Sequence, residues 1–279
     1  MKRPPVIWLS ALIVILAVPT HLIGLLAPSI YRDPAVLLPQ NRGTDLVTLA
    51  LAIPLLAFTA TAVARGSLRF RPLWLGALAY LVYAYGMYAM AVRWNPLFLV
   101  YVALFGLSLF TLIIGLVQTD AAQVRAALTA PLPVRLVAAY LTGIGVIVAA
   151  MWLGEEVRAL VSGTIPSSVL QFETPTNIVH VFDLGVVLPA MILAAVQLLR
   201  RRPWGVVLAG MLLVKASTIG VWVIAMIWLS AREGFRSPPV YTLFFLALTA
   251  GGAALAWRFL GTFRPLSGGS RSQTRFGRV

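Results

Sequence analysis

The chain has 279 residues, of which 60% are hydrophobic and only 11% are charged, whereas soluble domains carry about 25% charged residues. Its apolar residues occur in blocks of about 20, the length that spans a hydrocarbon core of about 30 Å. This composition excludes a soluble globular protein, and the absence of cysteine excludes disulfides, thiol catalysis and cysteine-ligated metal sites. The net charge of +14 does not indicate nucleic-acid binding, because the basic residues lie at the ends of the apolar blocks.

Eight apolar segments predict an all-α, polytopic bundle of transmembrane helices. In chain order we expect spans at residues 6–28, 46–64, 73–92, 97–117, 134–153, 177–199, 206–230 and 240–260. The first follows Lys2 and Arg3, as in a secretory signal, but its apolar run continues to Ala27 without a clear cleavage site, so we expect a retained helix. Residues 1–260 are therefore expected to form one transmembrane domain, followed by a disordered basic tail at 261–279.

Arginine and lysine predict the orientation, because they concentrate on the cytoplasmic side of membrane proteins. With a cytoplasmic N-terminus, 15 basic residues lie inside (Lys2, Arg3, Arg65, Arg69, Arg71, Arg125, Arg135, Arg200, Arg201, Arg202, Arg258, Arg264, Arg271, Arg275 and Arg278) and 6 outside (Arg32, Arg42, Arg93, Arg158, Arg232 and Arg236). We therefore predict a multi-pass protein of the bacterial cytoplasmic (inner) membrane with both termini in the cytoplasm. The tail arginines are expected to contact anionic lipid headgroups, not nucleic acid.

Two longer outer connections are predicted, at residues 29–45 and 154–176. The run at 154–162 has an amphipathic pattern, so we expect it to lie along the outer surface. The polar segment 40–45 precedes the second predicted helix, and Thr44 or Asp45 is expected to be its N-cap.

The chain also shows signs of an internal repeat. Pro54 and Pro189 fall in the middle of the second and sixth predicted helices, where we expect kinks, and an arginine follows each by 11 residues, at Arg65 and Arg200. A proline and a tryptophan open the following helix in both places, at Pro72 and Trp74 and at Pro203 and Trp204. We predict a duplication with halves at about 1–120 and 130–260, related by an axis along the membrane normal. Chance recurrence of Pro and Trp at interfaces is the alternative.

Lys215 is the basic residue expected inside the hydrocarbon. It lies about 11 residues, or roughly 16 Å, into the seventh predicted helix, where an ionised lysine is costly but a neutral one is accessible. Tyr83 is expected at the same depth in the third helix, which also carries Tyr80, Tyr85 and Tyr88. These groups predict a ligand or proton site beside the Pro189 kink. Ordinary packing of a hydrogen-bonded amine is the alternative.

A second polar group is expected toward the outer leaflet, where it can form a vestibule. Its members are His21, Glu155, Glu156, His180 and Asp183. Histidine and carboxylate can ligate metals, but no two histidines share a helix face at metal spacing, so we expect no metal site. Asp183 is predicted about 10 Å from Lys215 along the membrane normal, too far for a direct salt bridge. Interfacial residues bonded to water and headgroups are the alternative, and the sequence does not indicate a cofactor.

Residues 95–108, 180–189 and 200–205 resemble a group of bacterial multi-pass membrane proteins to which no activity is attached. The resemblance covers most of the second to seventh helices and implies no substrate or site residue.

Three functions remain open from the sequence. The first is a small-solute or ion/proton-coupled transporter, or a ligand-binding membrane protein, with its site near Lys215. The second is a membrane enzyme that uses the outer His and carboxylate side chains. The third is a non-catalytic subunit that contacts a membrane-protein partner, or a second copy of itself, through small residues such as Ala216, Gly220 and 249–254. We favour the transporter over the enzyme.

Overall fold

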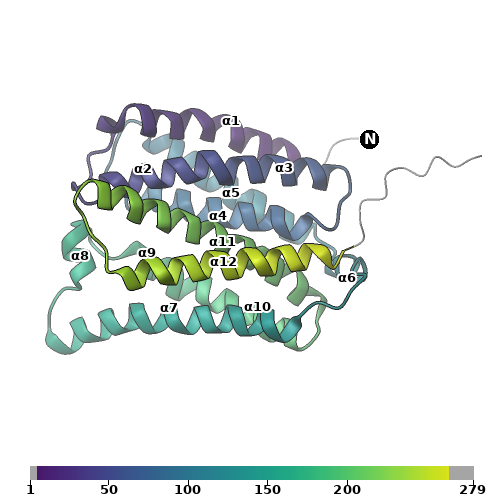
Figure 1. Ribbon diagram of the computed structural model, residues 1–279. Helices are drawn as coiled ribbons and strands as arrows, with labels where there is room; N and C mark the ends of the chain where they lie inside the picture. The colour runs from purple at the N-terminus through teal and green to yellow at the C-terminus, as the bar shows by residue number, and fades with distance from the viewer. Residues whose placement is uncertain (1–4, 264–279) are drawn as a thin grey trace, which may run out of the picture.

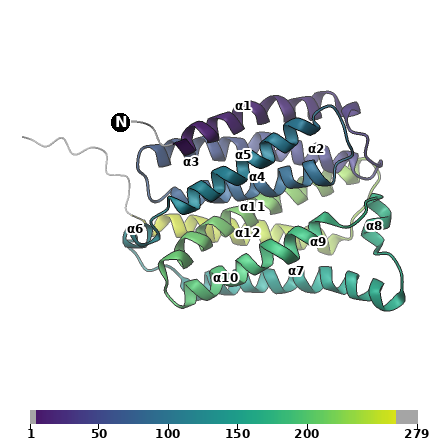
Figure 2. The ribbon, with the colours of Figure 1, turned by 180° about the vertical axis from the view of Figure 1, so that it is seen from behind.

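The computed structural model describes residues 5–263 and is a bundle of helices, which confirms the predicted all-α class (Figure 1). Residues 1–4 and 264–279, and with them the predicted contacts of the tail arginines, lie outside the described residues. Figures 1 and 2 show the helices side by side, with the start of α1 and the end of α12 at the same end of the bundle. We call this the terminal end, and the opposite end, which carries α8, the α8 end.

Eight helical segments within residues 5–263 are long and apolar enough to cross a membrane. They are α1 (Pro5–Leu26); α2, η2 and α3 (Leu38–Val47, Thr48–Ala52 and Ile53–Ala64); α4 (Arg71–Met90); α5 (Phe98–Val117); α7 (Val134–Ser162); α9, η3 and α10 (Ile178–Phe182, Asp183–Val187 and Leu188–Leu199); α11 (Pro203–Arg232); and α12 (Pro239–Gly261). Three short elements, η1 (Pro28–Ile30), α6 (Ala121–Ala126) and α8 (Ser167–Phe172), lie in the connections. The chain is therefore a multi-pass integral membrane protein.

Helices α4 and α11 form the centre of the bundle. Their most apolar segments are 78% and 67% buried, against 17% to 39% for the other six spans. The two helices touch at Gly76, where a Cβ would lie 2.6 Å from the carbonyl oxygen of Met211 and 2.7 Å from Cβ of Val214. Lipid is as apolar as leucine, so helices in membranes associate by such close packing at small residues.

Each predicted kink coincides with a turn of π-helix. In η2 the N–H of Ile53 donates to the carbonyl of Thr48, and in η3 the N–H of Leu188 donates to the carbonyl of Asp183. The next residue is Pro54 in one case and Pro189 in the other, and proline has no N–H to continue the ordinary ladder. The wider turn therefore falls where the ordinary ladder loses a donor, and such turns are frequent at functional sites.

Two predictions about the α8 end are wrong. The second span begins at Leu38, so Thr44 and Asp45 are not N-caps but buried residues inside α2. Residues 154–162 do not lie along the surface; they continue α7 until Gly163, whose φ of 63° ends the helix. In α2, hydropathy misses the extension because the polar side chains are satisfied inside the protein rather than by water.

The small-residue faces expected to contact another protein meet each other within the chain. A Cβ at Gly220 on α11 would lie 2.1 Å from Oγ1 of Thr249 on α12. These faces therefore hold α12 against the centre of the bundle.

The close contact at Gly76 predicts a loss of stability when a methyl group is added. Gly76→Ala is expected to destabilise the fold by about 1–3 kcal/mol, because the backbone of α11 lies where the methyl must go. The measurement is the apparent melting temperature of detergent-purified protein, followed by tryptophan fluorescence. Gly106→Ala is the matched control, because a Cβ at Gly106 on α5 meets nothing within 4 Å. Equal melting temperatures for the two variants would contradict this account of the α4–α11 contact.

Candidate functional site

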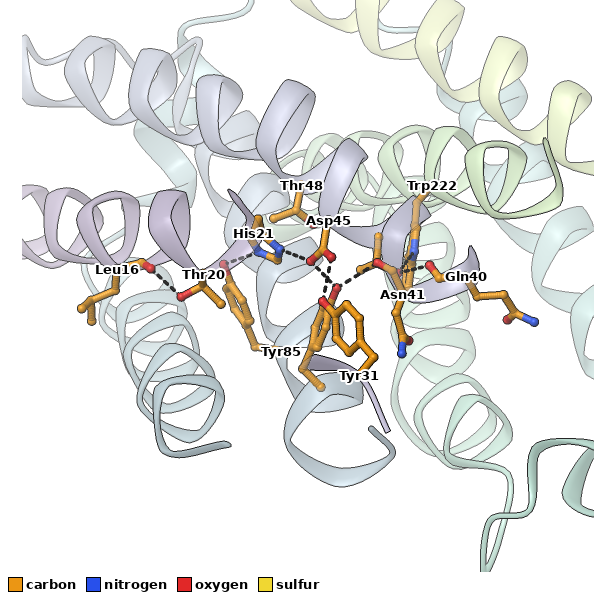
Figure 3. Close-up of polar contacts among 12 residues, drawn as sticks. Leu16, Thr20, His21, Tyr31, Gln40, Asn41, Asp45, Thr48, Tyr85 and Trp222 are labelled. Carbon is orange, nitrogen blue, oxygen red and sulfur yellow. Dashed lines mark hydrogen bonds and ion pairs between the residues drawn. The ribbon is translucent and has the colours of Figure 1, made fainter. Parts of the chain in front are cut away.

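Five buried polar side chains form a sealed cluster in the first half of the chain (Figure 3). They come from α1, the connection after it, α2 and α4, and we call them the His21–Asp45 cluster: His21, Tyr31, Asp45, Tyr85 and Tyr88. The Asp45 carboxylate lies 2.7 Å from Nδ1 of His21 and accepts hydrogen bonds of 2.7 Å from both Tyr31 and Tyr88. Nε2 of His21 lies 3.0 Å from the Tyr85 hydroxyl.

The His21–Asp45 pair is closed to solvent, and of the five cluster residues only Tyr88 also reaches a cavity wall. His21 is 0% and Asp45 is 1% exposed, so the carboxylate must obtain all its hydrogen bonds from the protein. Gly24 provides the room, because a Cβ there would lie 2.1 Å from Oδ2 of Asp45. Burial and the charge of Asp45 raise the pKa of Tyr31 well above its ordinary value, which keeps this hydroxyl a donor. The cluster therefore ties three helices together, and its geometry is that of an anchor.

A cavity of about 530 Å³ lies at the α8 end, between α2 and α4 on one side and α7, α9 and α11 on the other. Its aromatic lining includes Tyr83, Trp152 and Trp222. Its carboxylates are Asp33, Glu155 and Asp183. A cavity of this size, with aromatic walls and a few polar groups, is the usual form of a small-molecule site.

Asp33 lies at the rim of the cavity, outside the spanning helices. Its carboxylate accepts hydrogen bonds from the backbone N–H of Arg93 and from the side-chain amide of Asn41. Burial raises the pKa of Asp33, and these two hydrogen bonds act in the opposite direction. Asp33 therefore joins the two connections at this rim.

His180 lines the cavity, and the hydrogen-bond partners of its two ring nitrogens show which nitrogen carries the proton. The Asn177 side-chain oxygen caps α9 by accepting from two backbone N–H groups, so its nitrogen must face Nε2 of His180, at 3.2 Å. Nε2 is then an acceptor, and Nδ1 carries the proton that His180 donates to Glu156 at 2.6 Å. Glu155 lies 3.9 Å from Nε2 and accepts from Ser167 and Ser168.

Trp152 connects this wall to the interior. Its indole stacks on His180 with ring centroids 4.5 Å apart, and its Nε1 donates a 2.9 Å hydrogen bond to Asp183. Beyond it lies a second cavity of about 70 Å³, room for about two water molecules. The two cavities share four lining residues, namely Trp152, Asp183, Ile219 and Phe245.

Lys215 lines the smaller cavity near the middle of α11. It is only 6% exposed, and its Nζ lies 4.3 Å from the centre of the Tyr83 ring, a cation–π contact. Asp183 acts electrostatically on both Lys215 and Tyr83. Among residues 5–263 the amine has no hydrogen-bond or ion-pair partner. A buried amine in that condition, in the wall of a cavity, is suited to bind a ligand or exchange a proton.

The structure divides the residues that the sequence singled out into two groups. Glu155, Glu156, His180 and Asp183 gather around Trp152, whereas His21 belongs to the sealed cluster with Tyr85 and does not line the cavity. Tyr83 contacts Lys215, and Tyr80 instead bonds to Thr48. Within residues 5–263, no three His, Cys, Asp or Glu side chains gather in a geometry suited to a metal ion.

Sequence reasoning missed Asp45, Tyr31, Trp152 and Asn177 as site residues. One signal was available: His21 precedes Asp45 by 24 residues, and Glu156 precedes His180 by the same number, and both are bonded pairs. Tyr31 carried no such signal, because it lies in a connection whose path depends on tertiary packing.

The His21–Asp45 cluster predicts a stability effect that a surface carboxylate does not have. Asp45→Asn is expected to destabilise the protein by about 3–5 kcal/mol, because it leaves buried His21 and two tyrosine hydroxyls without their acceptor charge. Asp120→Asn is the control: Asp120 is an exposed N-cap of α6, a role that asparagine fills equally well. The readout is the apparent melting temperature in detergent. If Asp45→Asn melts with the wild type, the cluster is not an anchor.

Comparison of the chain with protein-family models, with curated proteins and with solved structures finds no match in any of the three. No relative therefore contributes an activity, a ligand or a site residue. What the protein does has to be argued from the cavities and the side chains that line them.

Proposed function

We propose that the protein transports a small solute across the membrane and that Lys215 couples this transport to a proton. One observation carries the proposal: a cavity of about 530 Å³ at the α8 end adjoins a smaller one lined by the buried amine of Lys215, which has no hydrogen-bond or ion-pair partner among residues 5–263. Solute sites near the midplane, beside interrupted helices, are typical of secondary transporters. The π-turn η3, which carries Asp183, is such an interruption.

Lys215 suits a proton-coupling role because lysine can lose its proton when buried. Its charged form gains from the Tyr83 ring and from the carboxylate of Asp183. Its neutral form avoids the cost of a charge in the hydrocarbon. The ionisable groups that face the amine are these two residues, so a solute that changes the charge near Asp183 changes the proton affinity of Lys215.

The bundle supports access from one end at a time. The large cavity lies at the α8 end, whereas α4 and α11 are in close contact at Gly76 and Met211, on the terminal side of Lys215. A solute that leaves at the terminal end requires these two helices to part. Parting of packed helices is an established form of conformational switching.

We also infer that the two halves of the chain are copies of one four-helix unit. A single offset of 135 residues relates Pro54 to Pro189 and the π-turn that starts at Thr48 to the one that starts at Asp183. The same offset relates the bonded pair His21–Asp45 to the bonded pair Glu156–His180, with acid and histidine exchanged. The cavity lies between the two units. Superposition of residues 7–117 on 142–252 tests the inference, and helices that fail to overlay would refute it.

We propose that the α8 end faces the outside of the bacterial cytoplasmic membrane, as the distribution of arginine indicates. The chain has no cysteine, so single cysteines can report access without background. Ile219→Cys, which lies in the wall of both cavities, is expected to react with a charged, membrane-impermeant methanethiosulfonate added outside intact cells. Leu213→Cys on the same helix, 0% exposed and outside both cavities, is expected to remain unmodified. Modification of Ile219→Cys only in inverted vesicles would reverse the orientation.

Transport itself is tested with proteoliposomes on a sensor membrane, where a solute library is screened for evoked currents. Solutes that give a current with the wild type are expected to give less than about one tenth of it with Lys215→Met, since 1.4 kcal/mol of lost coupling already amounts to tenfold. Arg158→Met, an exposed residue of α7, is the control and is expected to leave the current intact. Undiminished currents in Lys215→Met would rule out the coupling role.

A further inference from the structure

The geometry of the larger cavity points to a small organic cation as the solute. This cation binds against Asp183, the carboxylate that now faces the positive charge of Lys215. This inference deepens the proposed function and rests on it for the identity of the site. It concerns binding alone, so it can fail or hold independently of transport.

The charge of the cavity favours a cation. Its wall carries three carboxylates, and among the described residues that line it the single arginine or lysine is Arg236. Two of the carboxylates are committed to the protein: Asp33 accepts from Asn41 and the Arg93 backbone, and Glu155 accepts from two serines. Asp183 accepts the indole N–H of Trp152 and also interacts with the Tyr83 hydroxyl, so its partners are themselves side chains of the cavity wall. Asp183 is therefore the carboxylate best placed to meet a solute, because it stands where the two cavities meet.

The aromatic lining has the same preference. Tyr83, Trp152 and Trp222 all lie in the wall of the larger cavity. The faces of such rings attract ammonium groups, most strongly where water is excluded. Lys215 shows that the arrangement holds a cation, because its Nζ already lies 4.3 Å from the Tyr83 ring centre with Asp183 close enough to act on it.

Lys215 and the solute then compete for one negative charge. A single carboxylate can offset a single positive charge in a low-dielectric site, and a second unpaired cation there is costly. Entry of an organic cation therefore requires Lys215 to lose its proton to water in the small cavity or to withdraw from Asp183. The competition gives the exchange of one cation for one proton a structural basis.

An anionic solute is the contrary case, because it would seek Lys215 directly. To reach the amine it must pass the wall that Asp183, Trp152 and Phe245 form between the cavities, and so pass a carboxylate. Removal of Lys215 distinguishes the two cases. For a cationic solute it removes a competitor for Asp183, whereas for an anionic solute it removes the group that binds the solute.

The test uses three probes of nearly the same shape: choline, its neutral isostere 3,3-dimethylbutan-1-ol, and the anion 3,3-dimethylbutanoate. Binding to the full chain in detergent is measured by isothermal titration calorimetry. We expect choline to bind at least tenfold more tightly than the alcohol and the anion to bind no better than the alcohol. Equal binding of choline and the alcohol, or preferred binding of the anion, would overturn the inference.

Two variants sharpen the test. Asp183→Asn is expected to weaken choline binding at least tenfold, and Glu233→Gln, at the same end but outside the cavity, is expected to leave it unchanged. Lys215→Met is expected to strengthen choline binding severalfold, the opposite of its expected effect on transport. If Asp183→Asn does not fold, the probe series and Lys215→Met still decide the matter, and a weaker affinity in Lys215→Met counts against a cation. Choline binding without transport of any solute would refute the transporter and leave the cation site standing.

Discussion

Every polar group inside this bundle must find its partner within the chain, because the hydrocarbon of a membrane offers none. The features of the fold follow from that constraint. The prolines of α3 and α10 follow π-turns, in which the N–H just before each proline bonds to the carbonyl five residues earlier. Threonine hydroxyls such as that of Thr218 turn back onto the carbonyl four residues earlier. Asp45 is buried only because a histidine and two tyrosines surround its carboxylate. Among the described residues of the spans, the hydroxyls of Tyr101 and Ser108 and the amine of Lys215 do not close this accounting, and of these three groups Lys215 is the one that lines a cavity.

The two halves treat the same kind of polar pair differently. In the first half the histidine and the acid are wrapped by tyrosines and excluded from solvent. In the second half His180 lines the larger cavity, its partner Glu156 is half-buried, and Trp152 stacks on the histidine. On the proposed duplication, the first unit provides a rigid anchor and the second provides access to solvent. Residues of both halves line the cavity between them.

The sequence predicted the number and approximate position of the spans because both depend on hydropathy averaged over about 20 residues. It also predicted that Lys215 and Tyr83 share a depth, since helical rise converts residue number into height. The prediction failed where a hydropathy average hides which side chains bond to each other. Residues 38–45 look too polar for a spanning helix, yet the Asp45 carboxylate finds its hydrogen bonds within the protein and the helix continues through this segment. Residue number gives the depth of a side chain in the membrane but not the direction in which it points from its helix. The different surroundings of His21 and His180 could therefore not be predicted before the packing of the helices was known. Trp152 lies near the end of the fifth predicted span, and only the structure shows that its indole points to Asp183.

Trp152 is also the boundary between two compartments of very unequal size, with Asp183 on both sides of it. Where the indole of Trp152 alone separates the cavities, rotation of one side chain is enough to connect them. Such a rotation occurs on the picosecond to nanosecond scale unless packing holds the side chain. The contact between α4 and α11 on the terminal side of Lys215 opens more slowly, because whole helices must separate. Such motions take microseconds to milliseconds. Under the proposed transport function, Trp152 is a fast gate between the two cavities and the α4–α11 contact is a slow barrier on the terminal side. Passage through two barriers in series is governed by the slower one, so on this proposal the indole sets which molecules reach the amine, and the helix pair sets how often one crosses.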